Sequence, residues 1–283
     1  MRRFGPLLLL LAALPLTAIA QDPPEDKGGD GSGPEVAASS ELEVVLGLYK
    51  IAHGGKERFD GLRTMAFDYT PSVYDEEGNE LMGVKRRVSI LFRPDLDEQE
   101  QRTVRIEKDV VIEGEDPAKT VAIVTGSGAK VWVEGADGEL IRSEAQRFQN
   151  TASFHASALL NQLDLVYWLD GRDVRCRFGG VLKRDGKDYA TIEAEFAPGR
   201  QVPEPTRLYI SGTSSLIERV DVFDPKFHMR TSTAYLEEYA DHGGIKFPGR
   251  VRQVDRRGRP VGNWYLEGVE LNGEFEPEFW AKP

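Results

Sequence analysis

Alternating apolar and polar residues run through most of this chain, in segments separated by turn residues. A period of two places successive side chains on opposite faces of a strand, so each segment predicts a strand with one buried face. Asp185-Gly186 separates two such segments and is typical of a tight hairpin turn. The predicted strands cover residues 62–70, 84–93, 102–111, 120–125, 129–134, 139–142, 181–184, 187–196, 206–210, 216–223, 231–239, 245–255 and 261–271.

Two segments have the longer period of a helix. Residues 41–53 carry apolar side chains three and four positions apart, and Gly54-Gly55 supplies a left-handed stop. Residues 145–169 are the other helical candidate and also have one apolar face. No rhythm of strand, helix and strand is present, so the sheet should be antiparallel and highly curved or closed. A bent sheet has an apolar concave face, and these two helices are available to cover it.

The N-terminus has the three parts of a secretory signal peptide. Arg2 and Arg3 form the basic end, residues 7–16 the apolar core, and residues 18–20 a small-residue cleavage site. The apolar run is shorter than the roughly 20 residues that span a bilayer. We therefore expect residues 1–20 to be removed, which leaves a periplasmic or otherwise exported, soluble protein that does not span the membrane.

Two further segments follow the signal peptide. Residues 21–40 consist largely of Pro, Gly, Asp, Glu and Ser, which predicts a disordered linker. The remaining residues, 41–283, fit one β domain. Its single cysteine, Cys176, cannot form a disulfide within the chain, and its place in a strand-like segment favours a buried or half-buried structural thiol.

The chain is acidic, and this limits its partners. The formal net charge is −11, and removal of the signal peptide takes away Arg2 and Arg3 but no acid, which gives −13. A surface of this charge repels nucleic acid and anionic lipid headgroups. We therefore expect no nucleic-acid partner, whereas neutral acyl chains stay open.

Few residues are suited to catalysis or metal binding. Gly126-Ser127-Gly128 lacks the spacing of a serine-hydrolase motif. His53-Gly54-Gly55 and His242-Gly243-Gly244 resemble the oxyanion loops of esterases, but turns that require positive φ explain their glycines. The histidines lack the spacing of a zinc site, and surface or capping positions are the simpler interpretation: His53, His155, His228 and His242. We expect a binding protein with no cofactor, metal or catalytic residue; a hydrolase of an unrecognised type stays an alternative.

Several motifs follow the order seen in one family of exported lipid carriers. Residues 83–94 form a strand that ends in Phe92-Arg93-Pro94, and residues 125–133 form a hairpin with glycine at its tip and Val131-Trp132 after it. Residues 208–210 and 216–220 are similar to the later strands of that family, and residues 269–279 are similar to its closing segment. The chain thus resembles the periplasmic lipoprotein carrier superfamily, which includes a lipoprotein chaperone, its outer-membrane receptor and the sensor domain of an envelope-stress regulator.

The resemblance implies both a fold and a function. The fold is a mainly β (α+β) domain, in which a curved antiparallel sheet forms an incomplete barrel with a helical lid over an apolar cavity. The function is that of an outer-membrane lipoprotein-sorting type of carrier, which shields the acyl chains of lipids or lipoproteins during transport. An envelope protein-binding or sensor module on the same fold is the alternative, and it would suit a filled cavity.

The resemblance also assigns residues to the cavity and lid. The family's strand-end arginine helps to hold the lid closed and matters for cargo release, and Arg93 occupies its position. Strict alternation places Arg93 on the face opposite Phe92, so a bulge or a rim position is needed for it to reach the lid. The predicted cavity and lid residues are Met65, Phe67, Ile90, Phe92, Arg93, Trp132, Phe154, Leu159, Leu163 and Trp168.

Overall fold

The computed structural model describes residues 40–93, 102–110, 118–153, 155–156, 174–196 and 205–283. The predicted signal peptide, residues 1–20, lies outside these residues, as does the predicted linker except for Ser40. Ser40 begins the first helix, so the helix starts one residue earlier than predicted.

The helices are few and short. They are α1 (Ser40–His53), α2 (Lys56–Asp60) and the 3-10 helix η1 (Pro277–Trp280). Residues 146–153 and 155–156 are also helical, within the segment predicted as the second helix. The rest of that prediction, residues 157–169, lies outside the described part of the chain.

Strands make up most of the described chain. They are β1 (Thr64–Tyr74), β2 (Glu80–Met82), β3 (Arg86–Phe92), β4 (Arg102–Val110), β5 (Ala118–Thr125), β6 (Gly128–Glu134), β7 (Leu140–Ser143), β8 (Val174–Arg184), β9 (Lys187–Phe196), β10 (Thr206–Ser211), β11 (Ile217–Phe223), β12 (Arg230–His242), β13 (Ile245–Asp255) and β14 (Pro260–Leu271).

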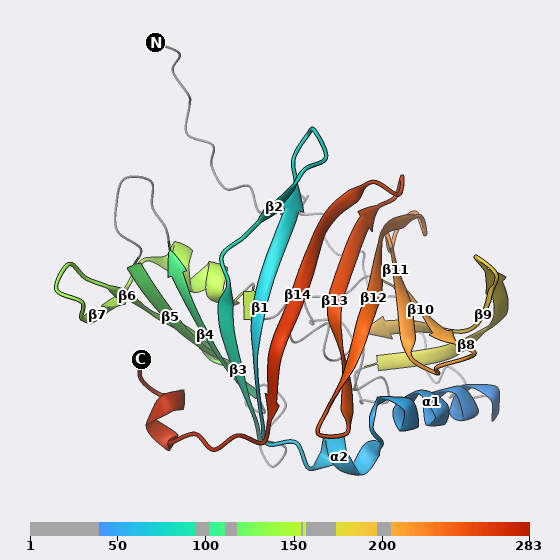
Figure 1. Cartoon of the computed structure of the whole chain (residues 1–283), viewed down its shortest axis with the longest axis horizontal. Helices are drawn as coiled ribbons and strands as arrows, with labels where there is room; N and C mark the ends of the chain where they lie inside the picture. Colours follow the sequence, from blue (N-terminus) through green and yellow to red (C-terminus); the bar gives the residue numbers. More distant parts are fainter. Residues whose placement is uncertain (1–39, 94–101, 111–117, 154, 157–173, 197–204) are drawn as a thin grey trace, which may run out of the picture. The chain divides into compact units, whose positions relative to one another are not determined.

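All of these strands belong to one antiparallel sheet. Its order is β7-β6-β5-β4-β3-β1-β14-β13-β12-β11-β10-β9-β8, with β2 beside β1. Two meanders, β1 to β7 and β8 to β14, are joined where β1 pairs with β14. The strands change direction progressively from β1 to β8, so the sheet is strongly twisted and curved (Figure 1). It is not closed, because β7 and β8 lie at opposite edges. The predicted curved, antiparallel half-barrel is confirmed.

The two faces of the sheet differ in polarity, as the alternation in the sequence predicts. Phe67, Val88 and Ile106 are register partners on β1, β3 and β4, and all three are buried in the hydrophobic cluster. The next residues along these strands, Asp68, Arg87 and Glu107, face the other way and form another row of partners. One face is therefore apolar and the other carries charge.

The predicted strand bounds are accurate for β9 and β13, whereas β8 begins seven residues before the predicted strand at 181–184. Its pairing with β9 shifts register between Phe178 and Gly180, and Gly180 has a φ of 94°. Residues 174–178, before this bulge, alternate between apolar and polar as well, but the predicted strand covered only the part of β8 that follows the bulge. Cys176 lies on β8 before the bulge, half-buried against the hydrophobic cluster, which agrees with the predicted structural thiol.

Candidate ligand-binding face of the sheet

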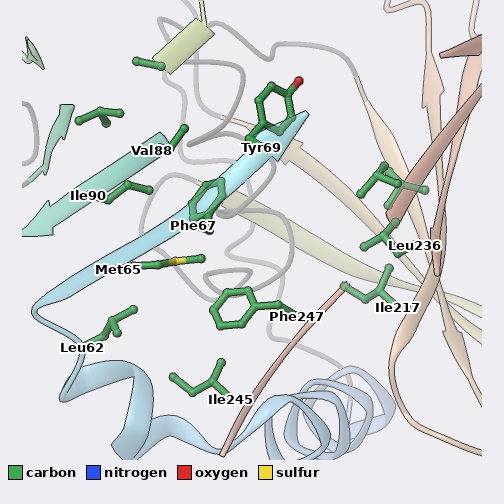
Figure 2. Packing of buried hydrophobic residues seen from close by; sticks show 14 of the residues in the cluster. Leu62, Met65, Phe67, Tyr69, Val88, Ile90, Ile217, Leu236, Ile245 and Phe247 are labelled. Atoms are coloured by element: carbon green, nitrogen blue, oxygen red, sulfur yellow. The ribbon is translucent and has the colours of Figure 1, made fainter. Parts of the chain in front are cut away.

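A single hydrophobic cluster covers the apolar face and draws side chains from both meanders. Met65 and Phe67 on β1 contribute from one side, and Ile217 on β11 and Leu236 on β12 contribute from the other (Figure 2). In the sheet order, β14 and β13 lie between these two groups. Side chains from such separate strands join one cluster because the sheet bends toward this face. The apolar face is therefore the concave one.

Helix α1 and the described part of the second predicted helix pack on this concave face. Leu42 and Tyr49 of α1 are buried in the cluster, and α1 contacts β13 and β8. Ala152 and Ala156, from the helical residues between β7 and β8, belong to the same cluster. The burial of these two alanines places the described helical residues after β7 on the concave face.

The last residue of α1, His53, is fully buried. Its ring lies edge-on to those of Tyr49 and Tyr239, with centroids 5.1 and 5.6 Å away. Its Nδ1 donates to the carbonyl oxygen of Tyr49 at 2.9 Å, so the ring satisfies the helix end. Burial is the main cause that lowers the pKa of His53 to about 4, and the cation Lys246 adds to it. Of the two predicted placements, the helix-capping one agrees with this contact, and the surface one is wrong for His53.

The two His-Gly-Gly segments, which are distant in sequence, lie against each other. A Cβ on Gly54 would collide with the carbonyl oxygen of Gly244, and one on Gly244 would collide with the guanidinium of Arg58. Both glycines also have positive φ, 129° and 88°. Helix α1 and the turn between β12 and β13 therefore meet backbone to backbone. Gly54 and Gly244 are required both for this close approach and for the predicted positive φ.

Four of the predicted cavity residues come together on the concave face: Met65, Phe67, Ile90 and Phe92 are all buried in the cluster. Trp132 does not join them. It is half-buried on β6 and pairs with Val121, whereas its neighbour Val131 is the residue in the cluster. Alternation therefore places Trp132 on the opposite face.

Arg93 directly follows the end of β3 and is exposed. The predicted lid residues lie outside the described part of the chain: Phe154, Leu159, Leu163 and Trp168. The structure therefore leaves their roles, and the contact of Arg93 with a lid, as predictions.

The concave face also holds two cations that the predicted set omits. Arg86, the first residue of β3, pairs in register with Lys108 on β4 and with Tyr69 on β1. Arg86 is 6% exposed, and its guanidinium lies 5.6 Å from the centre of the Tyr69 ring. Its Nη1 donates to Nδ1 of His155 at 3.4 Å. Three basic side chains thus meet at one end of the apolar face.

Burial is the main cause of the shifted pKa values of these three basic side chains. Desolvation is the largest cause that lowers the pKa values of Arg86 and Lys108, and the charge of Arg86 lowers that of Lys108 further. The pKa of His155 falls to about 4 because of burial first, and then because of Arg86 and Lys108. His155 is therefore neutral near pH 7, and its ring can accept the hydrogen bond from Arg86.

The sequence contained a signal for both cations. On β3, Arg86 stands two positions before Val88 and four before Ile90. On β4, Lys108 stands two positions after Ile106. Period-two alternation places each of them on the apolar face. A charged residue on the same strand face as buried apolar residues indicates either the rim of the core or a polar site. Only the pairing of β3 with β4 shows that Arg86 and Lys108 are neighbours.

The opposite face has a buried cation with a different environment. Arg219 and Asp221 on β11 are 3% and 2% exposed and form an ion pair, with Nη2 and Oδ1 2.8 Å apart. Tyr209 and Thr233 donate hydrogen bonds to the same carboxylate at 2.7 and 2.6 Å. This network satisfies its own charge, so it has a structural explanation.

Nowhere in the described ranges do three or more His, Cys, Asp or Glu side chains gather where they could hold a metal ion. The same part of the chain contains no helix with the length and apolar character to cross a membrane.

Known structures share this fold, although the sequences have diverged. A DUF1329 family protein from Desulfovibrio piger is 15% identical, with a TM-score of 0.57 over 86% of this chain and 98% of the other. An outer membrane lipoprotein-sorting protein domain from Vibrio parahaemolyticus is 10% identical, with a TM-score of 0.52 over 84% and 94%. A LolA superfamily protein from Nitrosomonas europaea is 14% identical, with a TM-score of 0.50 over 80% and 95%.

The likeness lies in the fold. No protein-family model and no curated sequence matches the chain. The predicted resemblance to the lipoprotein carrier superfamily is confirmed by three-dimensional structure: the chain has the lipoprotein carrier-like half-barrel fold along nearly the full length of these proteins.

Proposed function

We propose that this protein is an exported, soluble carrier that binds the acyl chains of lipids or lipoproteins against the concave face of its sheet. The observation that carries the proposal is the single hydrophobic cluster that unites both meanders on that face. The shared fold with a lipoprotein-sorting domain supports it.

The energetics favour such a function. Burial of one methylene group contributes about 0.8 kcal/mol, so a fatty acyl chain provides useful affinity without specific headgroup contacts. The strands that supply Phe67, Phe247 and Leu236 form a rigid frame, whereas helices cover the face. An acyl chain would displace helical contacts and leave the hydrogen bonds of the sheet intact. The carrier then needs no covalent chemistry.

The lid completes the proposal. The segment between β7 and β8, which contains Leu159 and Leu163, would serve as the lid. Arg93 at the end of β3 would favour the closed, cargo-free state of this lid and thereby promote release. Exposure of Arg93 at the rim of the sheet makes it accessible to such a segment.

Native mass spectrometry combined with lipid extraction tests the proposal. The chain is exported to a periplasm and purified without detergent. We expect lipid or acylated peptide at about one per chain, with intact ester or amide bonds. A protein that carries no lipid and does not bind fatty-acid probes contradicts the carrier, and release of cleaved lipid favours the alternative, a hydrolase.

One observation favours the second candidate, an envelope protein-binding module. Strand β8 lies at an edge of the sheet and pairs with β9 on one side. It spans Val174–Arg184, and Val181 on it is 72% exposed. A long edge strand can bind an extended peptide by adding it to the sheet. A detergent-free protein without lipid that captures such a peptide would support this candidate.

A further inference from the structure

We infer that Arg86 and Lys108 form an anion site within the concave face, which binds the negatively charged headgroup of an acyl ligand. The inference deepens the proposed carrier function and rests on it. It assigns the cargo to a chemical class: single-chain or multi-chain acyl lipids whose headgroup carries a carboxylate or a phosphate.

The geometry places the two cations together and points them to the same face. Arg86 and Lys108 are directly opposite each other on neighbouring strands, which brings their Cβ atoms to within about 5 Å. Tyr69 lies on the other side of Arg86 in the same row. Lys108 is only half-buried, so a ligand can reach the pair from solvent.

The charge of the pair is uncompensated. No carboxylate pairs with Arg86 or Lys108 in the described residues, and the neutral ring of His155 is the acceptor for Arg86. The Nε atom of Arg86 is buried without a hydrogen-bond partner. A buried, unpaired cation is costly, and Arg219 shows the usual solution on the other face with its partner Asp221. A bound anion would satisfy both cations at once.

The neighbouring residues suit an amphiphile. The next pair of partners on the same face is Val88 on β3 and Ile106 on β4, and Ile90 follows Val88 on that face. All three are buried in the hydrophobic cluster. Two residues of a strand span about 7 Å. A headgroup at Arg86 and Lys108 therefore places the first methylene groups of its chain against Val88 and Ile106. These side chains are buried in the cluster, so an acyl chain would take the place of the helical side chains that now cover them. A free inorganic anion would make no use of this apolar neighbourhood, which is why we assign the site to a headgroup.

The acidic surface of the protein does not oppose this site. The net charge of −11 belongs to the whole sequence, and salt screens exposed charges beyond about 10 Å. Arg86 and Lys108 lie within the sheet face, where a local pair of cations is screened less. The expected repulsion of anionic headgroups applies to the outer surface.

Equilibrium binding of two fluorescent probes tests the assignment. The probes are a long-chain fatty acid and its methyl ester, which share one acyl chain and differ by the charge. We expect the acid to bind the wild-type protein about tenfold more tightly than the ester, which corresponds to about 1.4 kcal/mol, because only the carboxylate accepts hydrogen bonds as a charged group. Arg86→Met should remove this preference and leave the affinity for the ester unchanged.

The control variant is Arg87→Met. It removes the same charge one residue away, but Arg87 faces the other side of the sheet, where it pairs with Asp68 and Glu270. We expect it to keep the preference for the acid. If Arg86→Met does not fold, as judged by circular dichroism, Lys108→Met replaces it, since its side chain is half-exposed.

Three results would overturn the assignment, and they differ from one another. Equal binding of acid and ester by the wild-type protein removes the anion site and leaves the carrier intact. Absence of binding by both probes removes the carrier and the headgroup site with it. In the third result, acid and ester bind equally, but calorimetry detects binding of inorganic phosphate that Arg86→Met abolishes. This result would assign the site to a free anion instead of a headgroup.

Discussion

At the scale of single residues, burial decides the charge of several groups in this protein. His53 and His155 both have pKa values lowered to about 4, and desolvation is the first cause for each. His53 packs between tyrosine rings, whereas His155 lies beside Arg86. Both are neutral in the folded protein near pH 7, although the unfolded chain protonates them near pH 6.5.

The pKa of His53 predicts a loss of stability in mild acid. A lowered folded pKa means that the unfolded state binds the proton first, so the stability is full above about pH 6.5 and is lost as the pH falls toward 4. Between pH 7 and 4.5, His53 should account for about 2 to 3 kcal/mol of lost unfolding free energy.

Urea denaturation at the two pH values measures this contribution. The difference in unfolding free energy should be smaller in His53→Gln than in the wild-type protein. His228→Gln is the matched control, because His228 is exposed and should keep the wild-type pH dependence. The same pH dependence in all three proteins would show that His53 is not the titrating group.

At the scale of elements, close contacts between distant segments hold the covering pieces on the sheet. On the concave side, α1 ends where Gly54 meets the turn at Gly244. On the opposite side, η1 packs near β4: the guanidinium of Arg105 donates to the carbonyl oxygen of Phe279 at 2.7 Å and lies 4.3 Å from the centre of its ring. Each contact joins segments that are far apart in sequence, so each depends on the completed sheet.

The junction of α1 with the β12–β13 turn predicts unequal effects of alanine at two adjacent glycines. Gly54 and Gly55 both have positive φ, which costs an alanine about 1 to 2 kcal/mol. A Cβ on Gly55 meets nothing within 4 Å, whereas one on Gly54 collides with the backbone of Gly244. We therefore expect Gly55→Ala to lower the unfolding free energy by about 1 kcal/mol and Gly54→Ala by about 3 kcal/mol or more.

Chemical denaturation of both variants, each compared with the wild-type protein, gives these values. Gly55→Ala serves as the control for backbone strain alone. Equal destabilisation by the two alanines would mean that the contact between the two His-Gly-Gly segments adds nothing to the stability.

At the scale of the whole described domain, the topology gives an open sheet with one apolar concave face. The pairing of β1 with β14 joins the two meanders in the middle of the sheet, and the edges, β7 and β8, stay open. Helix α1 and the described helical residues after β7 pack on the concave face. In the proposed carrier, a ligand would enter by displacing these helical contacts, while the sheet would keep its hydrogen bonds.

This arrangement predicts that cargo release depends on the rim of the sheet. Replacement Arg93→Leu should slow the release of a bound fluorescent fatty acid severalfold, measured by stopped-flow dilution into acceptor vesicles, if Arg93 holds the lid in its family role. Arg63→Leu is a matched control: Arg63 is also exposed, and its carbonyl oxygen accepts a hydrogen bond from the backbone of Phe92 next to Arg93. Equal release rates in both variants and the wild-type protein would assign Arg93 to the solvated surface.

Much of the fold was predictable because its signals are local. Alternation predicted β9 and β13 with their observed bounds, and the periodicity of residues 41–53 predicted α1 to within one residue. At β8 the prediction began only after the bulge at Gly180, although residues 174–178 before the bulge alternate as well. The short β2 and α2 were missed since three and five residues carry no clear period.

The candidate site was predictable only in part. Met65, Phe67, Ile90 and Phe92 were found because apolar residues in a strand pattern identify the buried face. Trp132 was assigned from a motif, yet its phase in β6 sets it on the other side of the sheet.

By itself, the sequence determined the type of most of the longer elements, the alternating polarity of their faces and the acidic charge of the chain, because propensity and alternation act over a few residues. The tertiary structure decided which residues become neighbours. Pairing of β3 with β4 brings Arg86 beside Lys108, and pairing of β1 with β14 brings the two meanders onto one concave face. These contacts join segments separated by long stretches of chain, and strand order and curvature alone place them together.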